Sequence, residues 1–339
     1  MQGQSNRTQR NQSLEEFAAK SHVVACVDRS DMAQKILPHA AAIASDLGAS
    51  MSLLRVLEPP PSGEAQADPI EWDIRRREAR ESLEQLANSQ AEQVGFIETN
   101  VLEGQAAEQI CSCAADRSAD IIVLGLHGED MPAGNGLGNT VRRVIDRVSG
   151  AVLLVPTSVV KEYVVHYRRM LVPLDGSARA ESVLPLAVRL ARAERAELIL
   201  AHIVPEPILT DVGVPQEGDS ELRERVLQRN RQVAQKYLDR IRARIMQNGL
   251  TVGVLVMRNG DARGVLPQLI ADKGIDFVIL SAHGHSGRAD TPYGSVTAHL
   301  VTHSTAPILV VMNNNRRAGQ GGLTKNHATM RASNIAVAC

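Results

Sequence analysis

Short apolar runs alternate with longer amphipathic stretches along most of the chain. Runs such as 22–27 (HVVACV) and 169–174 (RMLVPL) are bounded by turn residues, a pattern typical of buried parallel strands. The stretch 31–48, which follows the first run, has the apolar spacing of a helix and ends at Gly48. Continued along the chain, the pattern predicts five strands separated by four helices, followed by the same order a second time.

The two halves of the chain carry the same sequence plan. Asp28 corresponds to Asp175 and Val56 to Ile203, 147 positions apart in both cases. Later landmarks are 156 positions apart, namely Gly104 and Gly260, Gly128 and Gly284, and Gly138 and Gly294. The difference places nine extra residues in the second half, between Ile203 and Gly260. Because a duplicated domain tolerates an insertion in one surface connection, we interpret the chain as two copies of one domain.

Glycine and proline mark the ends of the predicted helices. Long amphipathic stretches stop at Gly95 and at Gly249. The first helix of each half contains a proline, Pro38 or Pro185, so we expect a kink or an early end there.

The order of the elements predicts the fold and the edge at which a ligand binds. The fourth predicted strands are 119–125 and 275–281, and the fifth are 150–156 and 306–312. Strands that alternate with helices form a parallel sheet covered by helices on both faces, with right-handed crossovers. The sequence therefore predicts an α/β fold of two similar doubly wound domains. Ligands of such sheets bind beyond the carboxyl ends of the strands, which makes the loops after strands one and four the candidate site.

Composition and charge mainly exclude other classes of protein. The 339 residues suit about two domains, and 44% hydrophobic and 22% charged residues are typical of a globular chain. Aromatic residues make up 2% and the net charge is -1, so few rings can stack on bases and no positive field attracts nucleic acid. No apolar run approaches the roughly 20 residues of a membrane span, and the polar N-terminus lacks a signal core. Four cysteines do not make a disulfide scaffold here, and we expect a cytoplasmic protein.

A glycine pattern recurs after the two fourth strands. In the first half, G-x-x-G at 125–128 is followed after nine residues by Gly-Asn at 138–139. In the second half, S-x-x-G at 281–284 is followed after nine residues by Gly-Ser at 294–295. Glycine lets a phosphate or ribose approach the backbone, and the second pair begins a predicted helix whose free N–H groups attract anions. The Asn or Ser side chain could instead cap that helix, but the same spacing at both predicted ligand-binding edges favours a phosphate site.

With these motifs the chain resembles a tandem member of the universal stress protein family. In that family G-x-x-G, nine residues and then G-S/T marks the subclass that binds ATP, and VPLDGS at 172–177 matches the start of the domain. The resemblance covers about residues 21–157 and 168–312. It implies five parallel strands in each domain, and it implies that the fifth strands pair with each other, giving an intramolecular pseudo-dimer.

The resemblance also implies a set of nucleotide-binding residues. They are Asp28, Val56, Gly125, Gly128, Gly138 and Asn139 in the first repeat, and Pro173, Asp175, Ile203, Gly284, Gly294 and Ser295 in the second. The aspartates would hydrogen-bond the adenosine part, Val56 and Ile203 would contact adenine, and the loop residues would line the ribose and phosphates. The implied ligand is ATP, with AMP as an alternative, and Mg²⁺ would be bound mainly through the nucleotide.

Both repeats depart from the family pattern. Ser281 stands where the first glycine is expected, so its side chain either crowds the ribose or is tolerated. Asn139 stands where Ser or Thr is expected. Arg29 replaces the glycine found at Gly176, and it either hinders entry or adds a phosphate contact.

Pairs of histidine and cysteine residues are candidates for catalysis or metal binding. A histidine follows strand four in both repeats, and we favour a structural role for His127 and His283, with backbone hydrogen bonds, over acid–base catalysis. His299 and His303 share one helix face, which suits a metal ligand pair or a solvated face, and we favour the latter. The pair 111–113 (C-x-C) has its cysteines two apart on a predicted helix, so we expect buried or half-buried structural thiols.

Two further patterns have simpler interpretations as surface features. Ser286 in GHSG lacks the spacing of a nucleophile elbow. The arginine-rich segments 75–80 and 223–232 include acidic residues at helical spacing and are interpreted as solvated helix faces.

The function implied is binding in the stress response rather than catalysis. We therefore do not expect an enzyme, although a weak ATPase activity stays open. The alternative is an interaction scaffold with degenerate clefts that binds protein partners and no nucleotide; assembly into a homodimer also stays open. The expected segments are a flexible N-terminus (1–20), domain 1 (21–157), a linker (158–167), domain 2 (168–312) and a disordered tail (313–339).

Overall fold

The computed structural model describes most of the two predicted repeats. The described residues are 21–59, 68–127, 137–207, 218–246, 249–258, 260–285 and 293–312. The end segments 1–20 and 313–339 lie outside them, as do Gly128 and Ser286.

The first repeat has the predicted order of five strands and four helices. Its strands are β1 (His22–Cys26), β2 (Ser50–Leu57), β3 (Ile97–Glu103), β4 (Ile121–Gly125) and β5 (Ala151–Val155). Its helices are α2 (Met32–Leu47), α3 (Pro69–Val94), α4 (Ala106–Asp116) and α5 (Asn139–Arg147).

The second repeat follows the same order with one helix divided. Its strands are β6 (Arg169–Pro173), β7 (Glu197–Ile203), β8 (Val252–Met257), β9 (Phe277–Ser281) and β10 (Ile308–Val311). Its helices are α6 (Ala178–Glu181), α7 (Leu184–Ala193), α8 (Asp219–Met246), α9 (Ala262–Asp272) and α10 (Ser295–His303).

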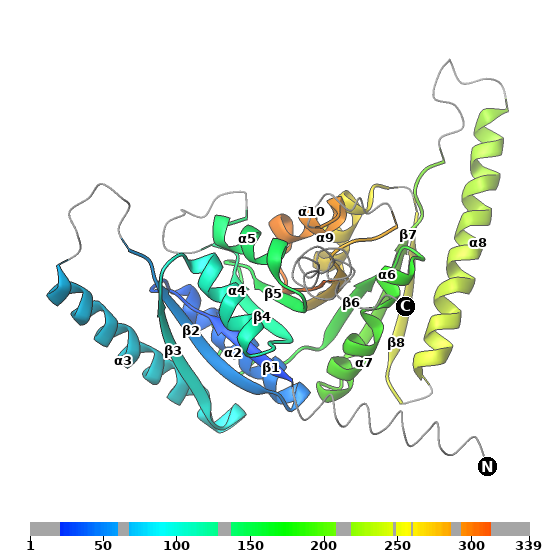
Figure 1. The fold of residues 1–339 in the computed structure, drawn as a ribbon. Coiled ribbons are helices and arrows are strands. Elements are labelled where there is room, and N and C mark those ends of the chain that lie inside the picture. Colours follow the sequence, from blue (N-terminus) through cyan, green and yellow to red (C-terminus); the bar gives the residue numbers. More distant parts are fainter. Residues whose placement is uncertain are drawn as a thin grey trace, which may run out of the picture.

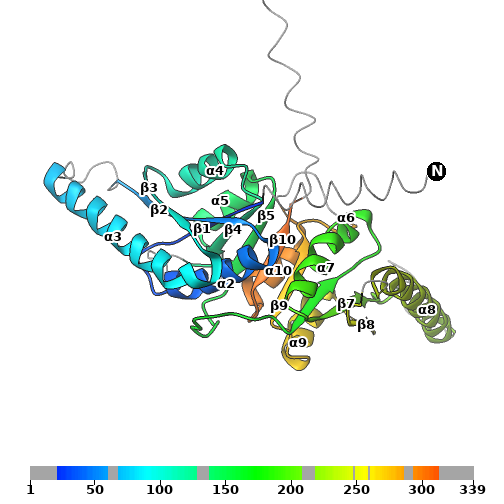
Figure 2. The ribbon, with the colours of Figure 1, turned by 90° about the horizontal axis from the view of Figure 1, so that it is seen from below.

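All ten strands belong to one sheet, in the order β3-β2-β1-β4-β5-β10-β9-β6-β7-β8. Neighbours within each repeat are parallel, as predicted, and β5 and β10 pair antiparallel at the centre of the sheet. Figure 1 shows the strands of both repeats, and Figure 2 labels β10 beside β5. The pairing of the fifth strands is therefore confirmed. Leu153 faces Leu309 across this junction, and both side chains are fully buried. The two repeats thus form one continuous sheet rather than two separate ones.

Helices cover both faces of the sheet and enclose two apolar cores. Successive strand residues point to opposite faces, so Val123 contributes to one core and Leu124 to the other. Helices α2, α3, α7 and α8 pack on the first face, and α4, α5, α9 and α10 on the second (Figures 1 and 2). Because each core spans both repeats, the repeats are expected to unfold together.

The two prolines in the first helices affect helix continuity differently. Helix α2 runs through Pro38 without a break and ends at Gly48, which adopts a left-handed conformation. In the second repeat the corresponding stretch is divided into α6 and α7, and Pro185 lies in the first turn of α7. Proline is tolerated there because the first N–H groups of a helix lack carbonyl partners. The early end predicted for these helices therefore occurs in the second repeat.

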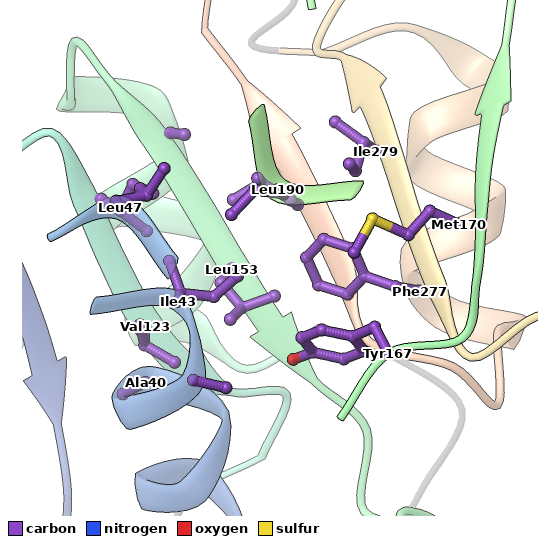
Figure 3. Close-up of a cluster of buried hydrophobic side chains, with 14 of the residues drawn as sticks. Ala40, Ile43, Leu47, Val123, Leu153, Tyr167, Met170, Leu190, Phe277 and Ile279 are labelled. Atoms are coloured by element: carbon purple, nitrogen blue, oxygen red, sulfur yellow. The ribbon is translucent and has the colours of Figure 1, made fainter. Parts of the chain in front are cut away.

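Aromatic and polar contacts join the repeats beside the central strands. The Tyr167 ring centroid lies 4.2 Å from that of Phe277, and His39 Nδ1 lies 2.7 Å from the Tyr167 hydroxyl. In Figure 3, Leu153 of β5 and Leu190 of α7 lie between the α2 side chains and Phe277 of β9. Arg189 of α7 also donates to the carbonyl oxygen of Leu47 at the end of α2. The junction therefore includes side-chain packing in addition to the strand pair.

Two carboxyl groups meet at this junction. Asp46 near the end of α2 neighbours Glu194, which follows α7 and has a side chain only 5% exposed. His166 Nδ1 lies 3.0 Å from Glu194 Oε2. Burial, together with the Glu194 carboxylate, raises the pKa of Asp46 to about 7.

Replacing Asp46 with asparagine is expected to change how stability depends on pH. The folded-state pKa of Asp46 lies above the reference value of 3.8, so the folded protein binds more protons between about pH 4 and pH 7. Asp46 thus makes the wild type less stable as the pH rises through this window. We expect the free energy of unfolding of Asp46→Asn to increase relative to wild type over the same window, by at most about 1.4 kcal/mol per pH unit.

Urea unfolding at a series of pH values measures this difference. Burial lowers the pKa of His39 to about 4, so His39 makes the folded protein more stable as the pH rises. Because His39 is present in both proteins, its contribution cancels in the difference between their free energies of unfolding. Asp116→Asn, at an exposed position on α4, is the matched control and should follow the wild type. A difference between Asp46→Asn and wild type that stays constant from pH 4 to pH 7 would contradict the prediction.

Candidate functional site

A large cleft opens in the first repeat where the strand order reverses, between β1 and β4. Its volume is about 1100 Å³. It lies beyond the carboxyl ends of β1, β2 and β4 and reaches the first turns of α3 and α5. Of the residues that the sequence assigns to this repeat, the described ones all line it: Asp28, Val56, Gly125, Gly138 and Asn139.

The inner part of the cleft is apolar. Its lining includes the buried side chains of Cys26, Leu54, Ile110, Leu124 and Val141. These come from three strands and from the helices that cover them, so the sheet itself provides the surface. An apolar surface with a few polar groups at its edge is typical of small-molecule sites.

The N-terminus of α5 faces this cleft without a side-chain cap. Gly138 is the N-cap residue and Asn139 the first residue of the helix, and no hydrogen bond from a capping side chain is formed among the described residues. Ser295 likewise begins α10 after Gly294, again without a cap. Neither Asn139 nor Ser295 therefore plays the capping role that the sequence left open, and the first N–H groups of α5 can bind an anion.

The space around glycine is tight at both ends of the first-repeat loop. A Cβ on Gly138 would lie 3.2 Å from the carbonyl oxygen of Leu126, which accepts the Gly138 N–H at 3.2 Å. A Cβ on Gly125 would lie 3.2 Å from the terminal methyl carbons of Ile36 and Met32. The backbone at Gly125 therefore lies close to side chains of α2.

Positive charge exceeds negative charge in the described lining of the cleft. The cationic side chains are those of Arg29, Arg55, Arg75 and Arg143. The anionic ones are those of Asp28 and Glu58. Arg55 is 5% exposed and donates to the carbonyl oxygen of Asp28 at 2.6 Å. Arg143 Nη1 lies 3.5 Å from Gln105 Oε1, which links α5 to the start of α4. A polyanionic ligand would match this charge.

The first aspartate and its neighbour are held by local contacts. Asp28 Oδ1 accepts hydrogen bonds from the N–H and the hydroxyl of Ser30, at 2.9 and 2.5 Å. Arg29 Nη2 lies 3.1 Å from Glu78 Oε2 on α3. This ion pair turns the Arg29 side chain toward α3. It is compatible with both roles given above for Arg29, which are hindering the entry of a ligand and contacting a phosphate.

In the second repeat Asp175 binds to the loop that follows β9. Asp175 Oδ2 accepts the backbone N–H of His285 at 2.5 Å, and Asp175 Oδ1 accepts from Ser177. A Cβ on Gly284 would collide with Asp175 Oδ2. Burial acts to raise the pKa of Asp175, but the Ser177 and His285 hydrogen bonds outweigh it and the pKa lies below its usual range. The carboxylate thus occupies one backbone N–H of this loop.

The other second-repeat candidates lie at the corresponding ends of elements. Pro173 ends β6, Ile203 ends β7, and Gly294 precedes α10. The Ser281 hydroxyl donates to the carbonyl oxygen of His283 at 2.9 Å, so it turns toward its own loop. The structure therefore places these residues along one edge of the sheet.

Sequence reasoning missed several residues of the first-repeat cleft, among them two on α3. Trp72 and Arg75, in the first turns of α3, line it. Arg75 belongs to the segment 75–80 that was interpreted as a solvated face; it is half-buried and lines the cleft. The only available signal was that the single tryptophan of the chain stands where the long helix begins. Helical periodicity could not show that this end of α3 overhangs the cleft.

The histidine candidates have different surroundings. His127 lines the cleft, and both of its ring nitrogens are buried with no hydrogen-bond partner in the described part of the chain. The backbone hydrogen bond expected of its ring is thus not formed among those residues. The rings of His299 and His303 stack with centroids 4.0 Å apart, and His303 Nδ1 lies 2.9 Å from the carbonyl oxygen of His299. Among the described residues no group of three or more His, Cys, Asp and Glu side chains could hold a metal ion.

The cysteines on α4 are structural in their surroundings, as expected. Cys113 is buried and Cys111 half-buried, both without a disulfide. Burial raises the pKa of both thiols. Within the described residues no helix is both long enough and apolar enough to cross a membrane.

Comparison with known proteins finds the same domain twice. The profile of the universal stress protein family matches residues 20–156 and 166–312. Universal stress protein Slr1230 of Synechocystis is 25% identical over 310 residues, which cover 85% of this chain and 98% of that protein. Universal stress protein YxiE of Bacillus subtilis is 27% identical over 151 residues, which cover 43% of this chain and 99% of that protein. A crystal structure of a universal stress protein from Archaeoglobus fulgidus has a TM-score of 0.60 at 17% identity, covers 87% of this chain and 97% of that one, and shows the likeness of fold alone.

Proposed function

Because the chain belongs to the universal stress protein family through two copies of its domain, we propose that it acts by binding ATP in the cleft of its first repeat. The observation that carries this proposal is the uncapped N-terminus of α5, which begins at Asn139 after Gly138 and faces a cleft with an excess of arginine. Helix N-termini of this kind bind phosphate through their free N–H groups and the helix dipole.

The cleft offers separate places for the parts of the nucleotide. Val56 and the apolar inner surface would contact adenine, and Asp28 would accept a hydrogen bond from the adenosine part. The phosphates would lie at Gly138 and Asn139, within reach of Arg143 on the same helix. A magnesium ion would be bound mainly through the phosphate oxygens.

The proposed mode of action is binding rather than turnover. The described groups near the proposed phosphate position, the α5 N–H groups and Arg143, are hydrogen-bond donors and stabilise bound phosphate in any state. A bound nucleotide would bridge α5 and the ends of β1 and β2, and it would thereby bias the surface that the first repeat offers to protein partners.

The second repeat is proposed to bind nucleotide weakly or not at all. Asp175 already accepts the His285 N–H and lies against Gly284. A phosphate at this loop would have to displace one carboxylate and would experience its negative charge. The wild type is therefore expected to bind one ATP per chain.

Calorimetric titration of ATP into the nucleotide-free full-length chain tests the proposal. We expect saturable heat with a stoichiometry of one and a Kd below about 1 mM. Two equivalent sites would show that Asp175 does not block the second loop. No heat at millimolar ATP, from a protein that remains folded by circular dichroism, would reject nucleotide binding and leave the interaction scaffold as the function.

A further inference from the structure

A tryptophan stands at the mouth of the first-repeat cleft. Trp72 lies in the first turn of α3, and it lines the cleft together with Arg75. The start of this helix is well defined, because Asp68 accepts the N–H of Ile70 at 2.9 Å and Pro69 occupies the first helical position. The position of the indole is thus set by the beginning of a 26-residue helix rather than by a loop.

Glu103 holds the indole in place. The Nε1–H of Trp72 donates to Glu103 Oε2 at 3.0 Å. The other carboxylate oxygen, Glu103 Oε1, lies 2.7 Å from Arg76 Nη2. Arg75 adds a cation over the ring, with its guanidinium carbon 5.9 Å from the ring centroid. One carboxylate therefore orients the ring through a hydrogen bond and is itself held by an ion pair.

The strand register places this ring at the adenine end of the cleft. Glu103 is the last residue of β3, and it pairs with Leu57 of β2. The preceding pair joins Leu102 to Val56, the residue proposed to contact adenine. The phosphate position at α5 follows β4, which lies on the other side of β1 in the sheet. Trp72 is thus beside the proposed base and away from the proposed phosphates.

We propose that Trp72 is the stacking surface for the base in this cleft and that it makes the first repeat selective for purine nucleotides. The inference rests on the proposed function, since it concerns the same cleft. A held aromatic ring gains more contact with a purine than with the smaller pyrimidine ring, and it contributes nothing to a ligand that has no base. In α8, the corresponding helix of the second repeat, the single aromatic residue is Tyr237, far from the first turn.

The single tryptophan allows a direct readout. ATP, CTP and inorganic tripolyphosphate are titrated into the full-length chain, and binding is followed by tryptophan fluorescence and, in parallel, by calorimetry. We expect ATP to change the emission of Trp72 with the same Kd that calorimetry gives. CTP is expected to bind several-fold more weakly, and tripolyphosphate is expected to bind without a change in emission.

Variants separate stacking from a general effect on the cleft. Trp72→Leu is expected to weaken ATP binding about 10-fold and leave tripolyphosphate binding unchanged, whereas Trp72→Phe should retain most of the ATP affinity. Ile74→Ala, at an exposed position of the same helix outside the cleft lining, is the matched control and should bind ATP as the wild type does.

The outcomes distinguish this inference from the function on which it rests. An absence of calorimetric heat with ATP would reject the proposed function itself. Saturable heat with ATP, together with unchanged Trp72 emission and equal ATP affinity in Trp72→Leu, would overturn the stacking role while nucleotide binding stands. Equal loss of ATP and tripolyphosphate binding in Trp72→Leu would also overturn it, because the variant would then have altered the cleft as a whole.

Discussion

Valine in place of Gly138 is expected to weaken ATP binding to the first repeat by roughly 100-fold. A Cβ at this position already approaches the carbonyl oxygen of Leu126 to 3.2 Å, and the two methyl groups of valine would extend into the space before α5. The phosphate would then lose the first N–H groups of the helix. Two charge-assisted hydrogen bonds of about 1.5 kcal/mol each correspond to a loss of roughly 100-fold in affinity, which calorimetric titration measures.

Gly294→Val is the matched control, since Gly294 is the counterpart of Gly138 in the second repeat. A Cβ there would lie 3.6 Å from the nearest atom, the carbonyl oxygen of Ala282, so the variant is expected to fold and to bind one ATP. Thermal melting should show that Gly138→Val also remains folded at the temperature of the titration. If Gly138→Val binds ATP normally and Gly294→Val does not, the second repeat is the working site and the assignment is reversed.

Alanine in place of Phe277 is expected to lower the free energy of unfolding by about 3–5 kcal/mol. Phe277 on β9 is fully buried, and its ring contacts that of Tyr167 in the core between the repeats. With only 2% aromatic residues the core is mainly aliphatic, and the surrounding side chains cannot readily fill a cavity of this size. Because the same core includes α2 and α7, one from each repeat, the loss should lower the stability of the whole chain.

Phe96→Ala makes the same chemical change at a surface position. Phe96 follows α3 and is 87% exposed, so its removal is expected to change the free energy of unfolding by less than about 0.5 kcal/mol. Urea unfolding of both variants, followed by circular dichroism, measures the difference. Equal effects of the two substitutions, or separate transitions of the two repeats in Phe277→Ala, would contradict a shared core.

Much of the fold could be predicted from the sequence because it depends on local and repeated patterns. The apolar run 22–27 forms a strand, and the helices before Gly48 and Gly95 end at these glycines. Both features are local, because the spacing of apolar residues and the backbone freedom of glycine act within a few residues. The duplication, visible in pairs such as Asp28 and Asp175, predicted two equal sets of elements. The pairing of β5 with β10 required the family resemblance, because no local pattern specifies which edge strands meet.

The candidate site was predictable only in part. The glycine spacing identified Gly125 and Gly138, since backbone space and free helix N–H groups depend on residue type and position alone. Residues that reach the site from distant segments could not be found this way. Trp72 is held by Glu103, 31 positions later, and Arg75 looked like one more charge on a solvated helix.

The sequence by itself determined the order of elements, the duplication and the glycine positions, because these are set by residue type and spacing along the chain. Only the tertiary structure decided what Asp175 binds, because that depends on where its carboxylate turns. Asp175 accepts a hydrogen bond from His285, which is 110 positions away and comes near only when β6 and β9 pair. Contacts between strands that are neighbours in the sheet but distant in the chain carry no signature in either segment alone.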